Sequence, residues 1–476
     1  MLAEVFIQEY LVSRDDLRFF EKRGVFQQGF LKYPKRAKKG RSLKTEPNPA
    51  KMGIHQKNIL RKREMACMNL TIFESAEKEL GSGLKIDPAS LYRAFEQVKD
   101  GRKKKGKRYP LPLLLTLLLL GKLAGETSIS GIIDWVKERQ GLLKQQLGWP
   151  KRFPVNSTYS QALAQCDAGQ IVTAIASVIL KARAVEQCET EPSRLLAERT
   201  SGEHLIHTAM DGKVLRGTLA HASEKQPSVH LLSLYECESG LVIAQEAVKN
   251  KENEITGSAA LLHPLLVKGR IVSTDAMHTQ KKWFAGIHAY GGYYLSIVKK
   301  NHPGVYQDLL DFFADRELDQ GEWDYHQSIQ KGHGRQEVRE IWSSTQMNAW
   351  FEKEWAGVSQ VFTIRRRVKT RENEREEIVY GLTNLPHQKA SARRLLALNQ
   401  RHWAIENRLH RRKDVTLGED ACQVRVQGAP LALAALNGGL LALMDWLRVT
   451  NVASQMRHFC AQPHEALQLL LGKLSR

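Results

Sequence analysis

The chain has little of what marks disulfide-bonded, zinc-binding or exported proteins. No Cys-x-x-Cys pair occurs, and no cysteine–histidine spacing is typical of a zinc site. The first residues lack the order of charged and apolar segments that opens a signal peptide. These absences favour a reduced, cytoplasmic protein. The six cysteines are scattered along the chain: Cys67, Cys166, Cys188, Cys237, Cys422 and Cys460.

Long apolar runs are also missing. The most apolar stretch, 110–120, is soon followed by Lys122 and is too short to cross a bilayer, so we expect a buried helix there. An amphipathic basic helix or a lipidation signal, which would direct the chain to a membrane surface, does not stand out either. The sequence therefore predicts no membrane partner.

Acidic residues are scarce relative to basic ones. The 476 residues include 71 Lys and Arg against 51 Asp and Glu, which gives a formal net charge of +20. A surplus of this size attracts polyanions, and nucleic acid is the commonest of them. A chain of this length also has room for two or three domains, each with its own core.

The first two segments differ in composition and periodicity. Residues 1–66 form a basic extension that we expect to be disordered. This extension is either a DNA-contacting arm or leader sequence upstream of a true start at Met65 or Met68. Residues 67–200 repeat apolar side chains at three- and four-residue spacing, which predicts a helical N-terminal domain.

From residue 204 the apolar pattern changes to short, strand-like runs. Three strands, a helix, a strand, a helix and a strand follow one another, which is the order of a ribonuclease H-like core. We therefore expect residues 201–304 to form the first part of such a core. The predicted elements are strands at 204–210, 229–236 and 241–249, a helix at 253–267, a strand at 270–274, a helix at 280–290 and a strand at 293–298.

The last two segments are an insertion and a second helical region. Residues 305–390 contain Trp323, Trp342 and Trp355 among alternating stretches, which predicts a β-rich insertion. Helical spacing then resumes, so 391–476 is expected to complete the core and add C-terminal helices. The predicted fold class is α/β, with a ribonuclease H-like catalytic core, a β-rich insertion and a mostly helical N-terminal domain.

Three acids stand in settings that suit a metal site. Asp211 and Asp275 each follow an apolar, strand-like run, and Glu406 lies in a helix-like segment. Two divalent ions about 3.5–4 Å apart can activate a nucleophile and neutralise the charge that develops on a phosphodiester. Mg²⁺ prefers oxygen ligands, so a few carboxylates and water suffice. Strand ends and a packed helix hold such ligands rigidly.

Taken one at a time, each acid has a simpler explanation. Asp211 before a glycine is a common turn signal, Asp275 before a helix is a typical N-cap, and Glu406 fits a solvated helix face. The residues nearby favour the metal site, because Lys213 and Arg216 place positive charge beside the first acid.

The helix around Glu406 carries polar residues in a row. His402, Glu406, His410 and Lys413 recur at three- and four-residue spacing and so share one face of a regular helix. Two imidazoles, a carboxylate and an ammonium rarely align on a surface helix without a polyanion or metal partner. Each histidine has the alternative of a hydrogen-bonded position in the core or at a cap.

Several motifs occur in a fixed order between about residue 90 and the C-terminus. They are Arg108–Leu111, Asp211–Gly217, Thr274–Gln280, His333–Arg339, His402–His410, Asp414–Thr416 and Glu419–Asp420. In this order they resemble the H-repeat-associated family of bacterial insertion-sequence transposases. The resemblance implies a DDE enzyme with a ribonuclease H-like core.

The resemblance also assigns roles to the three acids. Asp211 and Asp275 match the family's metal-binding aspartates and Glu406 its catalytic glutamate, so all three are expected to be catalytic and to bind two Mg²⁺ (or Mn²⁺) ions. The implied partners are DNA, as terminal inverted repeats and target, and a second copy of the chain assembled on that DNA. The expected location is the bacterial cytoplasm, at the nucleoid.

Six further residues are weaker candidates for binding DNA phosphate or positioning water. They are Lys213, Arg216, His278, His402, Arg411 and Lys413. Residues 411–413 depart from the family, which usually has tryptophan and apolar residues there. The helical segment before residue 200 is the expected site of end-specific DNA binding.

The expected reaction has two steps. Water attacks the phosphodiester at the element end and frees a 3′-hydroxyl, which then attacks target DNA by direct transesterification. Two other functions stay open. One is a catalytically decayed, DNA-binding remnant, favoured by the departures at 411–413, and the other is a Mg²⁺-dependent nuclease without strand transfer.

Overall fold

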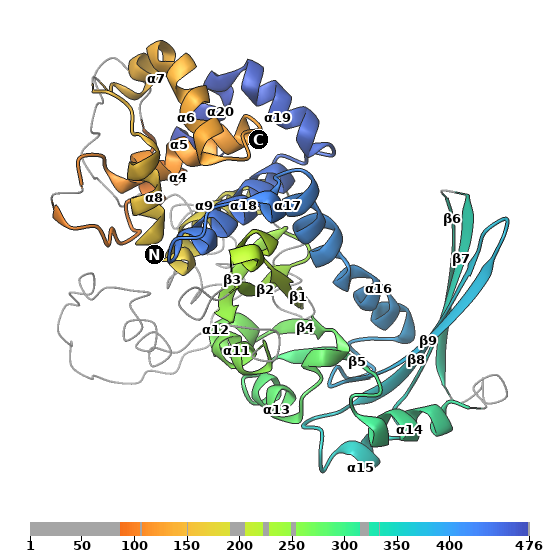
Figure 1. The fold of residues 1–476 in the computed structure, drawn as a ribbon. Helices are drawn as coiled ribbons and strands as arrows, with labels where there is room; N and C mark the ends of the chain where they lie inside the picture. The colour runs from red at the N-terminus through yellow and green to blue at the C-terminus, as the bar shows by residue number, and fades with distance from the viewer. Residues whose placement is uncertain are drawn as a thin grey trace, which may run out of the picture.

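The computed structural model describes residues 86–474, except for 105–106, 150, 191–204, 222–227, 249–253, 315–322 and 333. The predicted basic extension 1–66 and the first residue of the His333–Arg339 motif lie outside the described residues. A helical part, a sheet-based core and a β arm follow one another in space (Figure 1).

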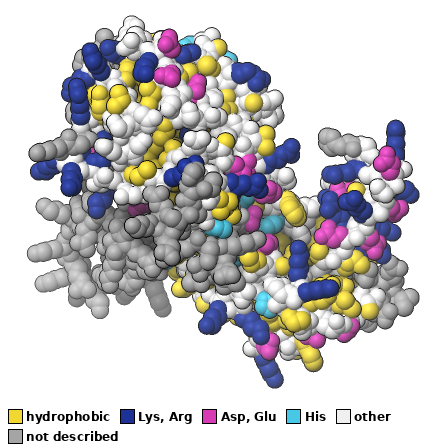
Figure 2. Space-filling view, in the orientation of Figure 1, with side chains coloured by type: hydrophobic (Ala, Val, Ile, Leu, Met, Phe, Trp, Pro, Cys, Tyr) yellow, Lys and Arg dark blue, Asp and Glu magenta, His cyan; other side chains and the backbone are white. Residues whose placement is uncertain are grey.

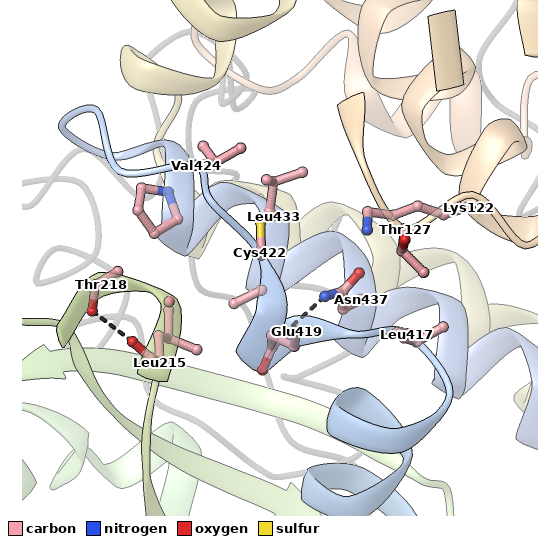
Figure 3. Close-up of a pocket in the computed structure, with 13 residues that line it drawn as sticks. Lys122, Thr127, Leu215, Thr218, Leu417, Glu419, Cys422, Val424, Leu433 and Asn437 are labelled. Atoms are coloured by element: carbon pink, nitrogen blue, oxygen red, sulfur yellow. Dashed lines mark hydrogen bonds between the residues drawn. The ribbon is translucent and has the colours of Figure 1, made fainter. Parts of the chain in front are cut away.

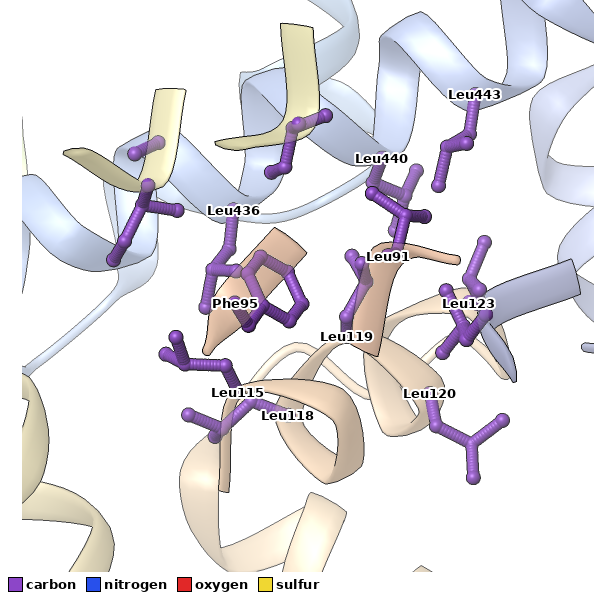
Figure 4. Packing of buried hydrophobic residues seen from close by; sticks show 14 of the residues in the cluster. Leu91, Phe95, Leu115, Leu118, Leu119, Leu120, Leu123, Leu436, Leu440 and Leu443 are labelled. Atoms are coloured by element: carbon purple, nitrogen blue, oxygen red, sulfur yellow. The ribbon is translucent and has the colours of Figure 1, made fainter. Parts of the chain in front are cut away.

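The helical part is built around α5 (Leu111–Leu123), whose residues from Leu113 to Leu123 are all buried. A helix that is apolar on every side is stable only inside protein, and α5 accordingly packs against helices from both ends of the chain. Figure 4 shows its leucines facing those of α18. The other helices here are α4 (Leu91–Phe95), α6 (Ile129–Glu138), α7 (Gln140–Leu147), α8 (Asn156–Ala164), α9 (Ala168–Thr190), α18 (Ala429–Trp446), α19 (Val452–Ala461) and α20 (Pro463–Leu471).

Two of these helices, α9 and α18, are long and apolar enough to cross a membrane by length and composition alone. Within the protein, 89% of the α18 span is buried, and the helix lies against α8 and α9. Its apolar surface is therefore already covered by protein.

Nine strands form one mixed sheet in the order β3-β2-β1-β4-β5-β9-β8-β7-β6. Strands β3, β2 and β1 are antiparallel, and β1, β4 and β5 are parallel. This arrangement confirms the predicted α/β class with a ribonuclease H-like core. The strands are β1 (Ile206–Val214), β2 (His230–Glu236), β3 (Leu241–Val248), β4 (Arg270–Thr274), β5 (Tyr293–Val298), β6 (Asp324–Gly332), β7 (Arg335–Ser344), β8 (Gln360–Lys369) and β9 (Glu374–Thr383).

The helices between the core strands agree with prediction except in one place. The helix expected over 253–267 is broken into α11 (Glu254–Leu261) and α12 (Pro264–Val267). Proline has no N–H to continue a helix but fits its first turn, so Pro264 begins the second one. The helix before β5 is α13 (Lys281–Ala289).

The β-rich insertion continues the core sheet as an antiparallel arm, β6–β9, and also contains α14 (Pro303–Phe312) and α15 (Asn348–Phe351). Strand β9 pairs with β5 from Leu295↔Thr383 to Val298↔Tyr380, so arm and core share one hydrogen-bonded sheet. Figure 1 shows the far half of the arm projecting beyond the other elements, and Figure 2 shows cationic and anionic side chains mixed along it.

Candidate active site

Asp211 and Asp275 come to the same place on the core sheet. Strands β1 and β4 pair in parallel up to Met210↔Thr274, so the next residue of each strand is one of the two aspartates. Strand β1 itself continues to Val214, because its antiparallel partner β2 stays paired with it. The prediction that Asp211 ends a strand was therefore wrong, although it does lie where the parallel pairing ends.

Asp275 is exposed and caps a short 3₁₀ turn. Its Oδ1 accepts a hydrogen bond from the backbone N–H of Met277 at 3.1 Å. The capping alternative is thus confirmed for this residue. One oxygen makes this bond, and the carboxylate has a second oxygen to offer to a ligand.

Glu406 lies on a π-helix rather than on a regular α-helix. Helix α16 (Ala392–His402) is followed by six π-helical residues, Ile405–His410, and then by α17 (Arg411–Val415). Short π-helical turns occur frequently at functional sites. Ion pairs connect this turn and the start of α17 to α18, because Arg408 and Arg412 pair with Asp445 of α18 at 2.9 and 3.0 Å.

His410 completes a compact cluster with two of the acids. Its Nδ1 is 3.2 Å from Oε2 of Glu406 and 3.5 Å from Oδ2 of Asp211. One ligand atom from each of the three residues lies within 4.8 Å of the others, which is close enough to hold a metal ion. The sequence placed His410 on the right face but did not assign it to the site. Its four-residue spacing from Glu406 was the available signal.

The electrostatics of this acidic site (Asp211, Asp275, Glu406 and His410) favour a bound cation. Burial raises the pKa of Asp211, His410 and the N–H of Gly212 oppose this rise, and the charges of Asp275 and Glu406 add to it. The hydrogen bond from His410 holds the pKa of Glu406 below its usual range. Since the charges of Asp275 and Glu406 add to the cost of ionising Asp211, a divalent ion beside Asp211 would relieve that cost.

Lys213 does not face the acidic site as a free cation. Its ammonium group pairs with Asp414, with Asp420 at 3.1 Å and with Glu419 at 4.0 Å. Although burial disfavours the ammonium, these partners together raise the pKa of Lys213. The predicted phosphate contact is corrected, because the side chain is held in internal ion pairs that join β1 to the segment after α17.

Lys413 is fully buried, with 1% of the residue exposed. Its Nζ donates to the carbonyl oxygen of Ala434 at 3.1 Å and lies 3.7 Å from Glu419, and burial lowers its pKa. A side chain in this position cannot reach DNA, so its predicted role as a phosphate contact is also corrected.

A third buried lysine, Lys122 of α5, interacts electrostatically with Glu419. Burial lowers the pKa of Lys122, and the charges of Cys422 and Glu419 oppose that change. Figure 3 shows Lys122 beside a small cavity, across from Glu419 and Asn437. We call the whole set the ion-pair cluster: Lys122, Lys213, Lys413, Asp414, Glu419 and Asp420.

The two remaining histidine candidates are neutral core residues. Nδ1 of His402 is 2.9 Å from Oγ of Ser273, which is 2.8 Å from Nε2 of His207. Burial lowers the pKa of His402 to about 4 and that of His207 to about 3. Burial also lowers the pKa of His278, against the opposing charge of Asp275. The core alternative therefore holds for His402 and His278, and a charged contact with phosphate is corrected.

Arg216 and Arg411 remain open to solvent. The Arg216 side chain is 75% exposed and lies 3.4 Å from Asp420, and Arg411 is exposed on α17. Figure 2 shows a broad hollow between the helical part and the arm, with acidic and histidine side chains on its inner side. Among the six weaker candidates, these two arginines are the ones that a DNA strand could reach.

Comparison with known proteins finds two family models that match these segments. The transposase DDE domain model matches residues 203–429, and the DDE_Tnp_1-associated model matches 92–179. In Escherichia coli strain K12, the "Putative protein YbfL" is 28% identical over 69% of this chain and 83% of its own length. The "H repeat-associated putative transposase YhhI" is 32% identical over 46% of this chain and 58% of its own length.

A solved structure, the synaptic complex of piggyBac transposase with hairpin DNA, aligns over 79% of this chain and 85% of that chain. The sequence identity is 11% and the TM-score is 0.32. A score this low carries no argument about shared structure.

Proposed function

The chain belongs to the H-repeat-associated family of transposases with a DDE domain, and we propose that it catalyses DNA transposition for a bacterial insertion sequence. It would bind the terminal inverted repeats of its element in the cytoplasm, cleave there and join the freed ends to target DNA. The observation that carries the proposal is the convergence of Asp211, Asp275 and Glu406 beside one end of the parallel strands.

The three acids suit two Mg²⁺ (or Mn²⁺) ions. Asp211, Asp275 and Glu406 would together hold these ions. When bound, the ions lower the pKa of water and neutralise the charge that develops on the phosphodiester. Oxygen-rich, partly exposed carboxylates leave room for water and phosphate oxygens to complete the coordination.

The chemistry needs no covalent intermediate with the protein. Water attacks the phosphorus at the element end, the P–O3′ bond breaks, and the element keeps a 3′-hydroxyl. That hydroxyl then attacks target phosphorus and displaces the target 3′-oxygen, so one phosphodiester forms as another breaks. The acids hold the reacting groups in line, and positioning of this kind accounts for much of the catalysis of phosphoryl transfer.

DNA would enter through the hollow between helical part and arm. Arg216 and Arg411 are exposed and would contact phosphate. The overall charge of +20 favours this partner, and the helical segment before residue 200 is the proposed reader of the inverted repeats. A second copy of the chain would hold the other element end.

The departures from the family at 411–413 fit this fold. Arg412 pairs with Asp445 at 3.0 Å, Lys413 lies 3.7 Å from Glu419, and α17 forms across both residues. These charges are therefore accommodated in the packing, and they no longer favour a decayed copy over an active one.

The test is a cleavage and joining assay with purified protein, Mg²⁺ and DNA that carries the element ends. We expect nicked and joined products from the wild type and from E352Q, which alters an exposed acid at the end of α15. D275A and E406A should lose both products and still bind DNA. No product with Mg²⁺ or Mn²⁺ leaves the DNA-binding remnant, and nicking without joining leaves the nuclease.

A further inference from the structure

The ring of His410 is directed at the acidic site by its packing. The residue is 4% exposed, and its Nε2 is buried without a hydrogen-bond partner among the described residues. Its Nδ1 contacts Glu406 and Asp211 at 3.2 and 3.5 Å. The Nδ1 atom of this imidazole is therefore turned toward the two carboxylates.

These separations suit neighbouring ligands of one ion. In an octahedral site with bonds of about 2.1 Å, adjacent ligand atoms lie about 3 Å apart. The contacts of Nδ1 with both carboxylates are close to that value, and the three ligand atoms lie within 4.8 Å of one another. Small side-chain adjustments would bring all three to a shared ion. Without an ion, the same nitrogen is hydrogen-bonded to Oε2 of Glu406 at 3.2 Å.

The nature of the ligand atoms bears on which metal is bound. Carboxylates alone suit Mg²⁺, which prefers oxygen, whereas an imidazole nitrogen favours transition ions such as Mn²⁺. We propose that His410 is a ligand in the ion site of Asp211 and Glu406, and that this site consequently binds Mn²⁺ more tightly than Mg²⁺. This inference rests on the proposed metal-dependent function and adds a nitrogen ligand and a metal preference to it.

A simpler role for His410 would be to hold Glu406 by a hydrogen bond. A positioning residue of that kind would affect Mg²⁺ and Mn²⁺ equally, because both ions would lose the same well-placed carboxylate. A ligand affects Mn²⁺ more, and it also couples the ¹⁴N nucleus of the imidazole to the unpaired electrons of the ion. These two differences separate the alternatives without any measurement of activity.

The experiment loads the full chain with less than one equivalent of Mn²⁺ and records pulsed EPR spectra. We expect ¹⁴N coupling typical of a bound imidazole in the wild type and in H464A, which removes an exposed histidine of α20. The coupling should disappear in H410A and H410Q. Affinity for Mn²⁺ should fall about 10–100-fold in both variants, while affinity for Mg²⁺ changes less than about threefold.

The outcomes separate failure of this inference from failure of the proposed function. Mn²⁺ bound at the site, as judged by its loss in D211N, but without ¹⁴N coupling would overturn the role of His410 and leave the function standing. Equal losses of Mn²⁺ and Mg²⁺ affinity in the His410 variants would also overturn the role of His410 and leave the function standing. If the wild type binds neither ion, the metal-dependent function itself fails. The wild-type spectrum decides even if the His410 variants do not fold.

Discussion

The acidic site and the ion-pair cluster are both built from charged residues, but they differ in charge balance and in burial. The acidic site has three carboxylates and one histidine, and it is partly open to solvent. The ion-pair cluster has three lysines and three acids, and most of it is buried. The acidic site contains no lysine or arginine, whereas the ion-pair cluster contains equal numbers of lysines and acids.

This contrast shows that charge balance separates a site from a scaffold more clearly than residue type does. Lys213 is two residues from Asp211, and Lys413 is seven from Glu406, yet both lysines belong to the balanced group. A balanced, buried group has its charges satisfied internally. An unbalanced group beside solvent lowers its free energy by binding a cation from outside.

The largest effect should come from the acidic site. Replacing Glu406 or Asp275 by the matching amide, E406Q or D275N, should reduce strand cleavage roughly a thousandfold or more, because metal binding contributes several kcal/mol to the transition state. The free energy of unfolding should change little, since both side chains are exposed. Single-turnover cleavage and urea unfolding measure the two quantities. A variant that cleaves at the wild-type rate would refute the assignment.

The ion-pair cluster should show the reverse pattern. K413A leaves Glu419 buried with less compensation, so we expect a loss of about 3–5 kcal/mol in the free energy of unfolding. The double variant K413M/E419L, which removes both charges, should recover much of that loss. Urea titration of the three proteins measures it. A loss below about 1 kcal/mol for K413A would show that the cluster is not the scaffold we describe.

Stabilisation by added Mg²⁺ should depend on the acidic site and not on the ion-pair cluster. Mg²⁺ that binds only the folded wild type should stabilise it by mass action, by about 2.7 kcal/mol at a hundred times the dissociation constant. D211N should lose this stabilisation, and K413M/E419L should keep it. Thermal unfolding with and without Mg²⁺ is the measurement, with EDTA as reference. Equal stabilisation of the wild type and D211N would place the bound ion elsewhere.

His402 and His207, which are linked through Ser273, should make stability depend on pH. Burial holds the pKa of His402 near 4 and that of His207 near 3, against an ordinary value of 6.5. Below pH 6.5 the unfolded chain takes up protons at these residues and the folded chain does not, so stability should fall as pH drops from 6.5 toward 4. Unfolding of the wild type and of H402N at pH 7 and pH 5 tests this. The dependence on pH should be shallower in the variant.

The smallest effect on folding should come from Arg216. Its side chain is 75% exposed and its pairing with Asp420 is a surface contact, so R216A should change the free energy of unfolding by less than about 0.5 kcal/mol. DNA affinity should fall, and the slope of log affinity against log salt should decrease by about one. R393A, on the exposed side of α16, is the matched control for a lost surface charge. An unchanged salt slope in R216A would remove Arg216 from the DNA surface.

The core of the fold and the pairing of the two aspartates were open to prediction because local patterns determine them. Strand and helix periods gave the order of elements, and Tyr293–Val298 forms the predicted strand. Once β1 and β4 are parallel neighbours, Asp211 and Asp275 must lie close together. Neither step needs information from distant parts of the chain.

The positions of Lys213 and Lys413 were beyond such reasoning for two physical reasons. Lys213 is paired with acids about 200 positions away, and no local spacing records such a contact. The π-helical turn uses more residues than an α-helical one, so it rotates everything after it. Glu406 and His410 stay together, and Lys413 turns into the interior instead of sharing their face.

The pairing of β9 with β5 has a mechanical consequence. Four residue pairs join β9 of the arm to β5 of the core, so the arm is attached through strand pairing and not through a single flexible loop. A load applied at its tip passes through β8 and β9 into β5, whose other neighbour is the strand leading to Asp275. The distance between the tip of the arm and the acidic site is therefore set by continuous strand pairing within one sheet.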